Sequence, residues 1–207
     1  MNRTILQYRR GIFAIAALLI LIGVFNIPRP PVASAHPLGN FTINRYSRIE
    51  PHADSIYVRY VLDMAEIPTF QEMPRIDLDR DGQVSDEERA AYLAIRVEEL
   101  KNGLRLSVND SLVQARVVEQ ELAFPPGQGN LPTLRLSFLL QGQIEQTDHQ
   151  KEQTLYYRDD NYSQRLGWKE IVVRPGNGVV LTQSTVSELG RAASISSKHA
   201  EKPAKPA

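Results

Sequence analysis

The sequence predicts a mainly β domain, an antiparallel β-sandwich or open barrel of about seven short strands with one inserted helix–loop–helix. Three observations carry this prediction. Apolar and polar residues alternate at period two in several short segments, which is the pattern of a half-buried strand. Turn sequences rich in glycine, proline, asparagine and aspartate separate these segments. Residues 65–102 alone change to the period of a helix, and repeated short strands around such an insertion are typical of a sandwich or an open barrel.

The strands are defined by their alternation and by the turns that bound them. Ile56, Val58 and Tyr60 lie on one side of such a segment, with Tyr57 and Arg59 on the other. The expected strands are residues 41–49, 56–62, 104–108, 112–124, 134–140, 154–158, 168–174 and 179–185. Together with the insertion they form one domain, residues 36–188, followed by a polar tail over residues 189–207 that we expect to be disordered.

The insertion, residues 65–102, has clear start and stop signals for its second helix. Ser85 and Glu88 have the S-x-x-E spacing of a capping box, so a helix should begin there. Gly103 is well placed to end that helix. Pro74 lies near the end of the first helix and lacks the N–H that a helix interior needs, so the first helix should be short or distorted.

The twelve residues between these helices have the pattern of an EF-hand calcium loop. Carboxylates stand at loop positions 1, 3, 5 and 12, and Gly82 occupies position 6, where the turn needs a backbone that glycine adopts without a clash. Calcium prefers six to eight oxygen ligands at about 2.3–2.6 Å, which side chains at alternate positions of a tight loop can supply. The predicted cofactor is therefore Ca²⁺, and its predicted ligands are Asp77, Asp79, Asp81, the main-chain carbonyl of Gln83, and Glu88. The alternative is an acidic surface loop that matches the pattern by chance.

Calcium loops of this type usually occur in pairs, and the chain has one good copy. The best second candidate begins at Asp159 and has Gln164 where glycine is needed, so we expect a polar hairpin loop there instead. The calcium site should then be solitary, with Val84 unpaired or resting on the host domain. A structural calcium is the expected role, because the sensor behaviour of an opening helix pair is less plausible for a single hand.

The amino-terminal segment has the features of an export signal. Arg9 and Arg10 precede an apolar run over residues 11–27, and an A-x-A cleavage site ends at Ala35. We therefore expect a signal peptide over residues 1–35 and a periplasmic or secreted location for the rest. An apolar run of 17 residues is also near the shortest that spans a bilayer, so an uncleaved membrane anchor is the alternative. The paired arginines would also suit a twin-arginine export route.

Composition limits the class of partner. The whole chain has 24 basic and 24 acidic residues; four basic residues and no acidic ones precede His36, which leaves 20 against 24, a net charge of −4, after cleavage. This balance gives no reason to expect nucleic acid as a partner. The chain has no cysteine, so disulfides, thiolate metal sites and a cysteine nucleophile are excluded.

The sequence does not predict an enzyme. It contains no G-x-S-x-G, no H-E-x-x-H and no glycine-rich phosphate loop. Asp159 and Asp160 are adjacent acids of the kind that glycosidases use, but neighbouring residues on a strand point to opposite faces. Trp168, the single tryptophan, is either a core aromatic at the start of a strand or an exposed platform for a partner.

Three segments resemble the extracytoplasmic amino-terminal domain of bacterial nickel/cobalt transporter-like membrane proteins. They are residues 36–44 (HPLGNFTIN), 62–72 (LDMAEIPTFQE) and 165–171 (RLGWKEI). Such proteins continue into several membrane helices, whereas this sequence ends in a polar tail, so transport itself is not carried over. The resemblance implies at most a relative of the soluble module that acts beside a transporter or another envelope protein.

Two functions follow from these patterns. The first is an exported calcium-binding β-domain that serves as a structural or interaction module. The second is a periplasmic accessory that binds nickel, cobalt or copper for a metal transporter. It would centre on His36, which after cleavage offers an α-amino nitrogen and an imidazole to one metal. The histidines that could assist, without a spacing that unites them, are His52, His149 and His199.

Overall fold

A computed structural model describes residues 41–144, 152–187 and 190–197, and these residues form a mainly β structure with two α-helices, as predicted. The strands are β1 (Ile43–Pro51), β2 (Ser55–Met64), β3 (Leu104–Val108), β4 (Ser111–Leu112), β5 (Ala115–Ala123), β6 (Leu134–Gln143), β7 (Gln153–Asp159), β8 (Lys169–Val173), β9 (Val179–Ser187) and β10 (Gly190–Ser197). The helices are α2 (Glu66–Glu72), α3 (Asp86–Asn102) and the short 3₁₀ turns η1 (Met73–Arg75) and η2 (Gln128–Asn130).

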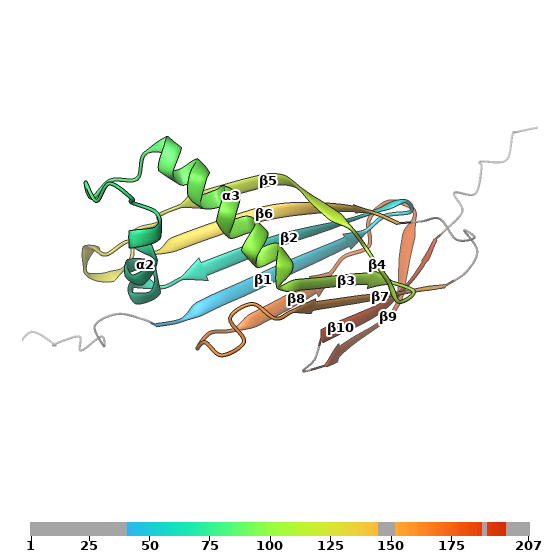
Figure 1. Cartoon of the computed structure of the whole chain (residues 1–207). Coiled ribbons are helices and arrows are strands. Elements are labelled where there is room, and N and C mark those ends of the chain that lie inside the picture. The colour runs from blue at the N-terminus through green and yellow to red at the C-terminus, as the bar shows by residue number, and fades with distance from the viewer. Residues whose placement is uncertain (1–40, 145–151, 188–189, 198–207) are drawn as a thin grey trace, which may run out of the picture. The chain divides into compact units, whose positions relative to one another are not determined.

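The strands form two open sheets, and among the described strands neither sheet closes into a barrel (Figure 1). The first has the order β5-β6-β2-β1-β8 and the second the order β4-β3-β7-β10-β9. The expectation of a purely antiparallel fold is wrong at one place, because β8 pairs with β1 in parallel. The chain reaches β8 through residues 160–168, which run beside the start of β1, where the Ile43 N–H donates to the Leu166 carbonyl at 2.8 Å.

One hydrophobic core is shared by both sheets and by α3. Buried and half-buried residues alternate along β1 and β2, as the period-two pattern predicts. Tyr60 of β2 stacks on Phe138 of β6 with their ring centroids 5.0 Å apart. The Ser47 hydroxyl of β1 lies 2.9 Å from the Tyr157 hydroxyl of β7, so the two sheets face each other directly.

The segment predicted as one strand over residues 112–124 is divided between the sheets. β4 pairs with β3 and β5 pairs with β6, so the chain crosses from one sheet to the other at Val113 and Gln114. The tail prediction also needs correction, because residues 190–197 form β10, which pairs with both β7 and β9. The predictions for residues 1–40 and 198–207 lie outside the described residues.

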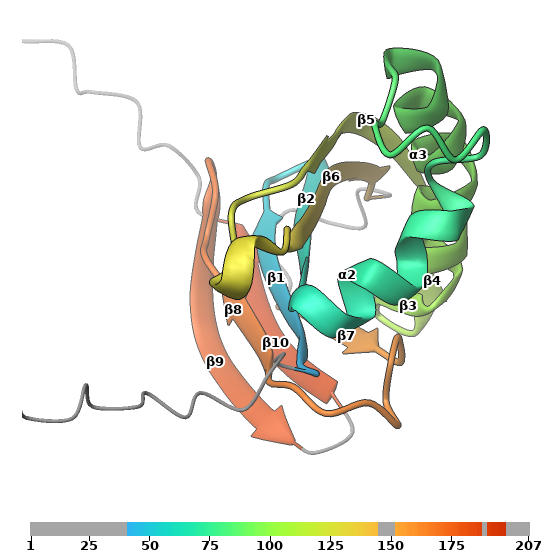
Figure 2. The same ribbon diagram turned by 90° about the vertical axis from the view of Figure 1, so that its left-hand side faces the viewer.

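The helix–loop–helix stands between β2 and β3, as predicted. α3 begins at a complete capping box, in which Ser85 accepts from the Glu88 N–H and Glu88 accepts from the Ser85 N–H. α2 has seven residues and continues as the 3₁₀ turn that contains Pro74, which confirms the prediction of a short first helix. α3 covers one side of the first sheet (Figures 1 and 2), and it buries Tyr92, Leu93, Val97 and Leu100 against the core.

Candidate metal centre

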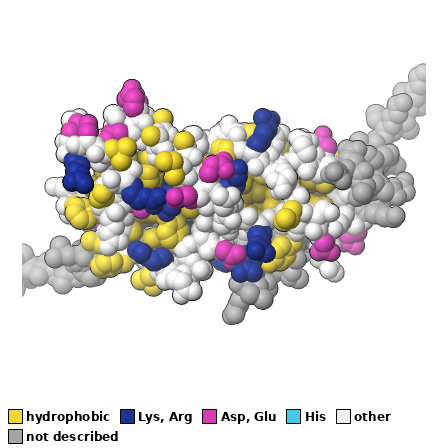
Figure 3. Space-filling model, in the orientation of Figure 1, with side chains coloured by type: hydrophobic (Ala, Val, Ile, Leu, Met, Phe, Trp, Pro, Cys, Tyr) yellow, Lys and Arg dark blue, Asp and Glu magenta, His cyan; other side chains and the backbone are white. Residues whose placement is uncertain are grey.

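The loop between η1 and α3 gathers three carboxylates. One oxygen from each of Asp77, Asp79 and Asp81 lies within 4.8 Å of the others. Two residues in the left-handed region, Arg80 (φ 62°) and Gly82 (φ 82°), turn the backbone on either side of Asp81. A Cβ at Gly82 would meet no atom within 4 Å, so glycine is favoured there by its backbone and not by lack of space. Figure 3 shows acidic side chains gathered at the end of the domain where this loop and the start of α3 lie.

Each of these carboxylates is aimed by a main-chain hydrogen bond. Asp77 Oδ2 accepts from the Gly82 N–H (3.1 Å), Asp79 Oδ1 from the Asp81 N–H (3.1 Å), and Asp81 Oδ1 from the Gln83 N–H (2.7 Å). The other oxygen of Asp77, Oδ1, is buried and accepts no hydrogen bond. A buried carboxylate oxygen without a donor is unfavourable unless a cation or a water satisfies it.

Glu88, the predicted twelfth-position ligand, approaches the loop from the first turn of α3. Its Oε1 accepts from the Leu78 N–H at 2.7 Å, and its Oε2 accepts from the Ser85 N–H at 3.0 Å and from the Ser85 hydroxyl at 2.8 Å. It therefore lies against the loop backbone but is not part of the group of three aspartates. Gln83, the predicted carbonyl ligand, follows Asp81 directly and is exposed.

The loop carries opposed electrostatic effects. The largest single effect on the Asp79 carboxyl is the hydrogen bond from the Asp81 N–H, which lowers its pKa. Desolvation, the charges of Asp81 and Glu88, and the contact with Asp77 all raise the pKa. Together they outweigh the hydrogen bond, so the pKa of Asp79 is raised. The pKa of Glu88 is lowered, first by the N–H and hydroxyl of Ser85 and then by the Leu78 N–H. The loop thus keeps Glu88 ionised and makes the charge on Asp79 unfavourable, which a bound cation would reverse.

A network of charged side chains joins the two helices beyond the loop. Glu72, at the end of α2, accepts from the Tyr92 hydroxyl at 2.9 Å and from Arg75 at 3.0 Å. Arg75 also bonds Glu99 of α3 at 3.2 Å, and Arg96 pairs with both Glu72 and Glu99. These contacts link the end of α2 and η1 to the middle of α3.

The second loop candidate, beginning at Asp159, gathers no comparable group. Asp159 is 2% exposed and lies 3.8 Å from Arg45 of β1, and Asp160 pairs with Arg158 at 2.6 Å. Among the described residues, the aspartates of the first loop are the one group of three potential metal ligands. The adjacent acids Asp159 and Asp160 are held by different partners, so they do not face a common substrate position.

Sequence reasoning missed the buried polar cluster around Arg45 and Asp159. Burial raises the pKa of Asp159, while the Asn161 N–H and Arg45 oppose that rise. One signal could have found the cluster. The inward face of β1 reads Ile43, Arg45, Ser47 and Ile49, so the period-two pattern already places an arginine among core residues.

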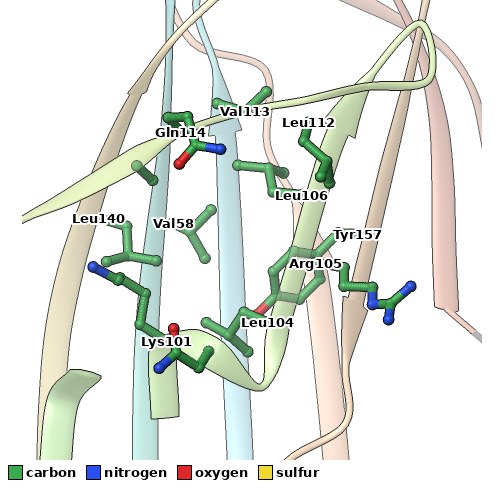
Figure 4. Close-up of a pocket in the computed structure, with 12 residues that line it drawn as sticks. Val58, Lys101, Leu104, Arg105, Leu106, Leu112, Val113, Gln114, Leu140 and Tyr157 are labelled. Atoms are coloured by element: carbon green, nitrogen blue, oxygen red, sulfur yellow. The ribbon is translucent and has the colours of Figure 1, made fainter. Parts of the chain in front are cut away.

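A cleft of about 240 Å³ opens between the sheets, beside the crossing from β4 to β5 (Figure 4). Its walls include Val58, Leu140 and Leu106. The polar residues that line it are Lys101, Asn102, Arg105, Gln114 and Tyr157. No carboxylate, histidine or serine lines it.

One of the four histidines, His52, lies among the described residues, and it is not part of a group of potential metal ligands. His52 Nδ1 accepts from the Asn177 N–H at 3.2 Å, and its ring packs edge-on against Tyr57, so it serves a turn. The other three lie outside the described residues; they are His36, His149 and His199. A nickel, cobalt or copper site at His36 stays a prediction, which titration of the protein with its natural amino terminus would test.

Trp168 and the neighbouring Leu166 are both at least half exposed, so the prediction of a core aromatic is wrong.

Among the described residues, no helix is both long and apolar enough to cross a membrane. Comparison with models of protein families and with curated proteins finds no match for the chain. Function is therefore inferred from the chemistry of the acidic loop.

Proposed function

We propose that this chain is an exported calcium-binding protein, a sandwich-type β-domain that carries a single EF-hand and acts as a structural or interaction module. The ion would be held by the side chains of Asp77, Asp79, Asp81 and Glu88 and by the main-chain carbonyl of Gln83. One observation carries the proposal. Asp77 Oδ1 is buried without a hydrogen bond in a group of three converging carboxylates, and a cation is the simplest partner for it.

The donor set favours calcium over other metals. All the proposed ligands are oxygens, which suit hard cations, whereas nickel and copper prefer the imidazole nitrogens that this loop lacks. Magnesium demands near-ideal octahedral geometry at about 2.0–2.1 Å and loses its waters reluctantly. A twelve-residue loop with a bidentate glutamate suits the larger and more irregular shell of calcium.

The packing of α3 favours a structural ion over a switch. Four apolar residues of α3 are buried in the core, and Arg89 donates to the Leu122 carbonyl and lies 5.7 Å from the ring centroid of Phe124. Opening the helix pair would break these contacts. Extracellular modules of this type bind calcium with a dissociation constant of about 10⁻⁴–10⁻³ M, so the site would remain occupied wherever external calcium exceeds that range.

Thermal unfolding of loop variants tests the proposal. Calcium at ten times its dissociation constant should raise the free energy of unfolding of the parent by about 1.4 kcal/mol. The double substitution Asp77→Ala and Glu88→Ala should abolish this gain. The matched control, Glu121→Ala with Glu170→Ala, removes two exposed carboxylates outside the loop and should keep it. An equal calcium-dependent shift in parent and loop variant would refute calcium binding at this loop.

A further inference from the structure

The loop between β7 and β8, residues 160–168, docks on the end of α3 that is remote from the acidic loop. The Asn161 side-chain amide donates to the Leu100 carbonyl at 2.9 Å, and the Asp160 N–H donates to the Gly103 carbonyl at 2.9 Å. The Leu100 carbonyl also accepts from the Gly103 N–H at 3.0 Å. The β7–β8 loop therefore adds hydrogen bonds at the end of α3, where the last carbonyls of a helix lack their usual partners within the helix.

The fit between this loop and α3 is close. A Cβ at Gly103 would overlap the Asn161 side chain, and Gly103 has an ordinary φ of −81°, so a larger residue there would require the Asn161 side chain to move. Asn161 is in turn fixed to the core, because its N–H donates to Asp159 at 2.9 Å and its carbonyl accepts from Arg45. The buried polar cluster thus anchors the residue that caps the helix.

Tyr162 connects the same loop to both helices. The Arg96 guanidinium lies 5.5 Å from the centroid of the Tyr162 ring and donates to its hydroxyl. Arg96 also lies 3.6 Å from Glu72 of α2. Tyr162 has a φ of 49°, which a bulky residue adopts only when its surroundings hold it there. These contacts give Tyr162 a fixed position against the helix pair.

We propose that Asn161 and Tyr162 are positioning residues for the metal site, and that the β7–β8 loop supports this single hand in place of a second one. The inference rests on the proposed calcium binding. Glu88 lies in the first turn of α3, so its approach to the aspartates follows the orientation of that helix. Contacts that hold α3 in this orientation raise the fraction of molecules whose site is ready to bind. The apparent calcium affinity rises in proportion to that fraction.

Calcium titration calorimetry on the full chain tests this role with two substitutions. Tyr162→Phe removes one hydroxyl, and Tyr162→Leu also removes the aromatic face, while neither changes the charge. Arg96 is eight residues beyond Glu88, about 12 Å along the helix, so Tyr162 cannot act by touching the ion. We expect calcium binding to weaken about twofold to threefold in the first variant and about fivefold to tenfold in the second, within the usual range of coupling between sites.

The matched controls are Tyr57→Phe and Tyr57→Leu, because the Tyr57 hydroxyl accepts from the Gln141 amide at 2.8 Å within the first sheet. They should leave the dissociation constant unchanged, with all titrations run where every variant is folded without calcium. Calcium should also slow amide exchange at residues 160–165 of the parent. A dissociation constant in Tyr162→Leu equal to that of a calcium-binding parent would overturn the positioning role alone, whereas a parent that binds no calcium would overturn the proposed function itself.

Discussion

The acidic loop and the inward face of the first sheet are stabilised in opposite ways. In residues 77–88, three carboxylates converge near water and are aimed by main-chain N–H groups. On the inward face of β2 and β6, Tyr60 and Phe138 are fully buried, and their rings stack on each other. The sheet therefore gains its stability from its own contacts, whereas the loop keeps an unfavourable charge balance that a bound cation or protonation would relieve. We therefore expect the stability of the loop, and not that of the sheet, to depend on calcium and pH.

The largest expected effects, of similar size, are in the core, and the first of them should be independent of calcium. Phe138→Ala removes a fully buried ring, so the free energy of unfolding should fall by about 3–5 kcal/mol. Urea denaturation with and without calcium measures the loss. A loss that differed by more than about 1 kcal/mol between the two conditions would contradict this independence, because the stability of the core would then depend on the loop.

The buried ion pair shares features of both regions, since it lies in the core between the two sheets and carries charge. Arg45→Met leaves the Asp159 carboxylate buried without its partner, and the free energy of unfolding should fall by about 3–5 kcal/mol. The double variant Arg45→Met with Asp159→Leu should recover most of this loss, because it removes both charges. Equal losses in the single and the double variant would show that the charge itself is not what destabilises.

The smallest effect should be in the loop, and its sign should depend on calcium. The pKa of Asp79 is raised, so in the calcium-free protein the stability it contributes is present at low pH and is lost as the pH rises through that raised pKa. Asp79→Asn should therefore be more stable than the parent in EDTA at pH 7, and this advantage should shrink on acidification below about pH 4.

Saturating calcium should reverse that order, because the substitution removes a ligand. Chemical denaturation at pH 7 and at pH 3.5, with EDTA or calcium, measures all four conditions. An Asp79→Asn variant that is less stable than the parent in EDTA at pH 7 would contradict the charge balance assigned to the loop.

Much of the fold could be predicted because its signals are local. The alternation of Ile56, Val58 and Tyr60 identified β2, and the spacing of Ser85 and Glu88 identified the start of α3. The parallel pairing of β1 with β8 and the pairing of β10 with β7 could not be predicted, since both depend on contacts between segments far apart in the chain.

The candidate site divides in the same way. The gathering of Asp77, Asp79 and Asp81 follows from a twelve-residue pattern, and the structure confirms that their carboxylates converge. The contacts of Asn161 and Tyr162 with α3 cross more than sixty residues of sequence, and no local pattern predicts them. The ligand residues within one loop could thus be predicted from the sequence, whereas the residues that contact α3 from the β7–β8 loop could be identified only from the structure.

Calorimetric titration of the full chain with calcium chloride tests calcium binding most directly. We predict one site per chain, a dissociation constant of about 10⁻⁴–10⁻³ M, and loss of the heat in the Asp77→Ala variant. A parent that gives no heat up to millimolar calcium, or an Asp77→Ala variant that gives the same heat as the parent, would contradict calcium binding at this loop.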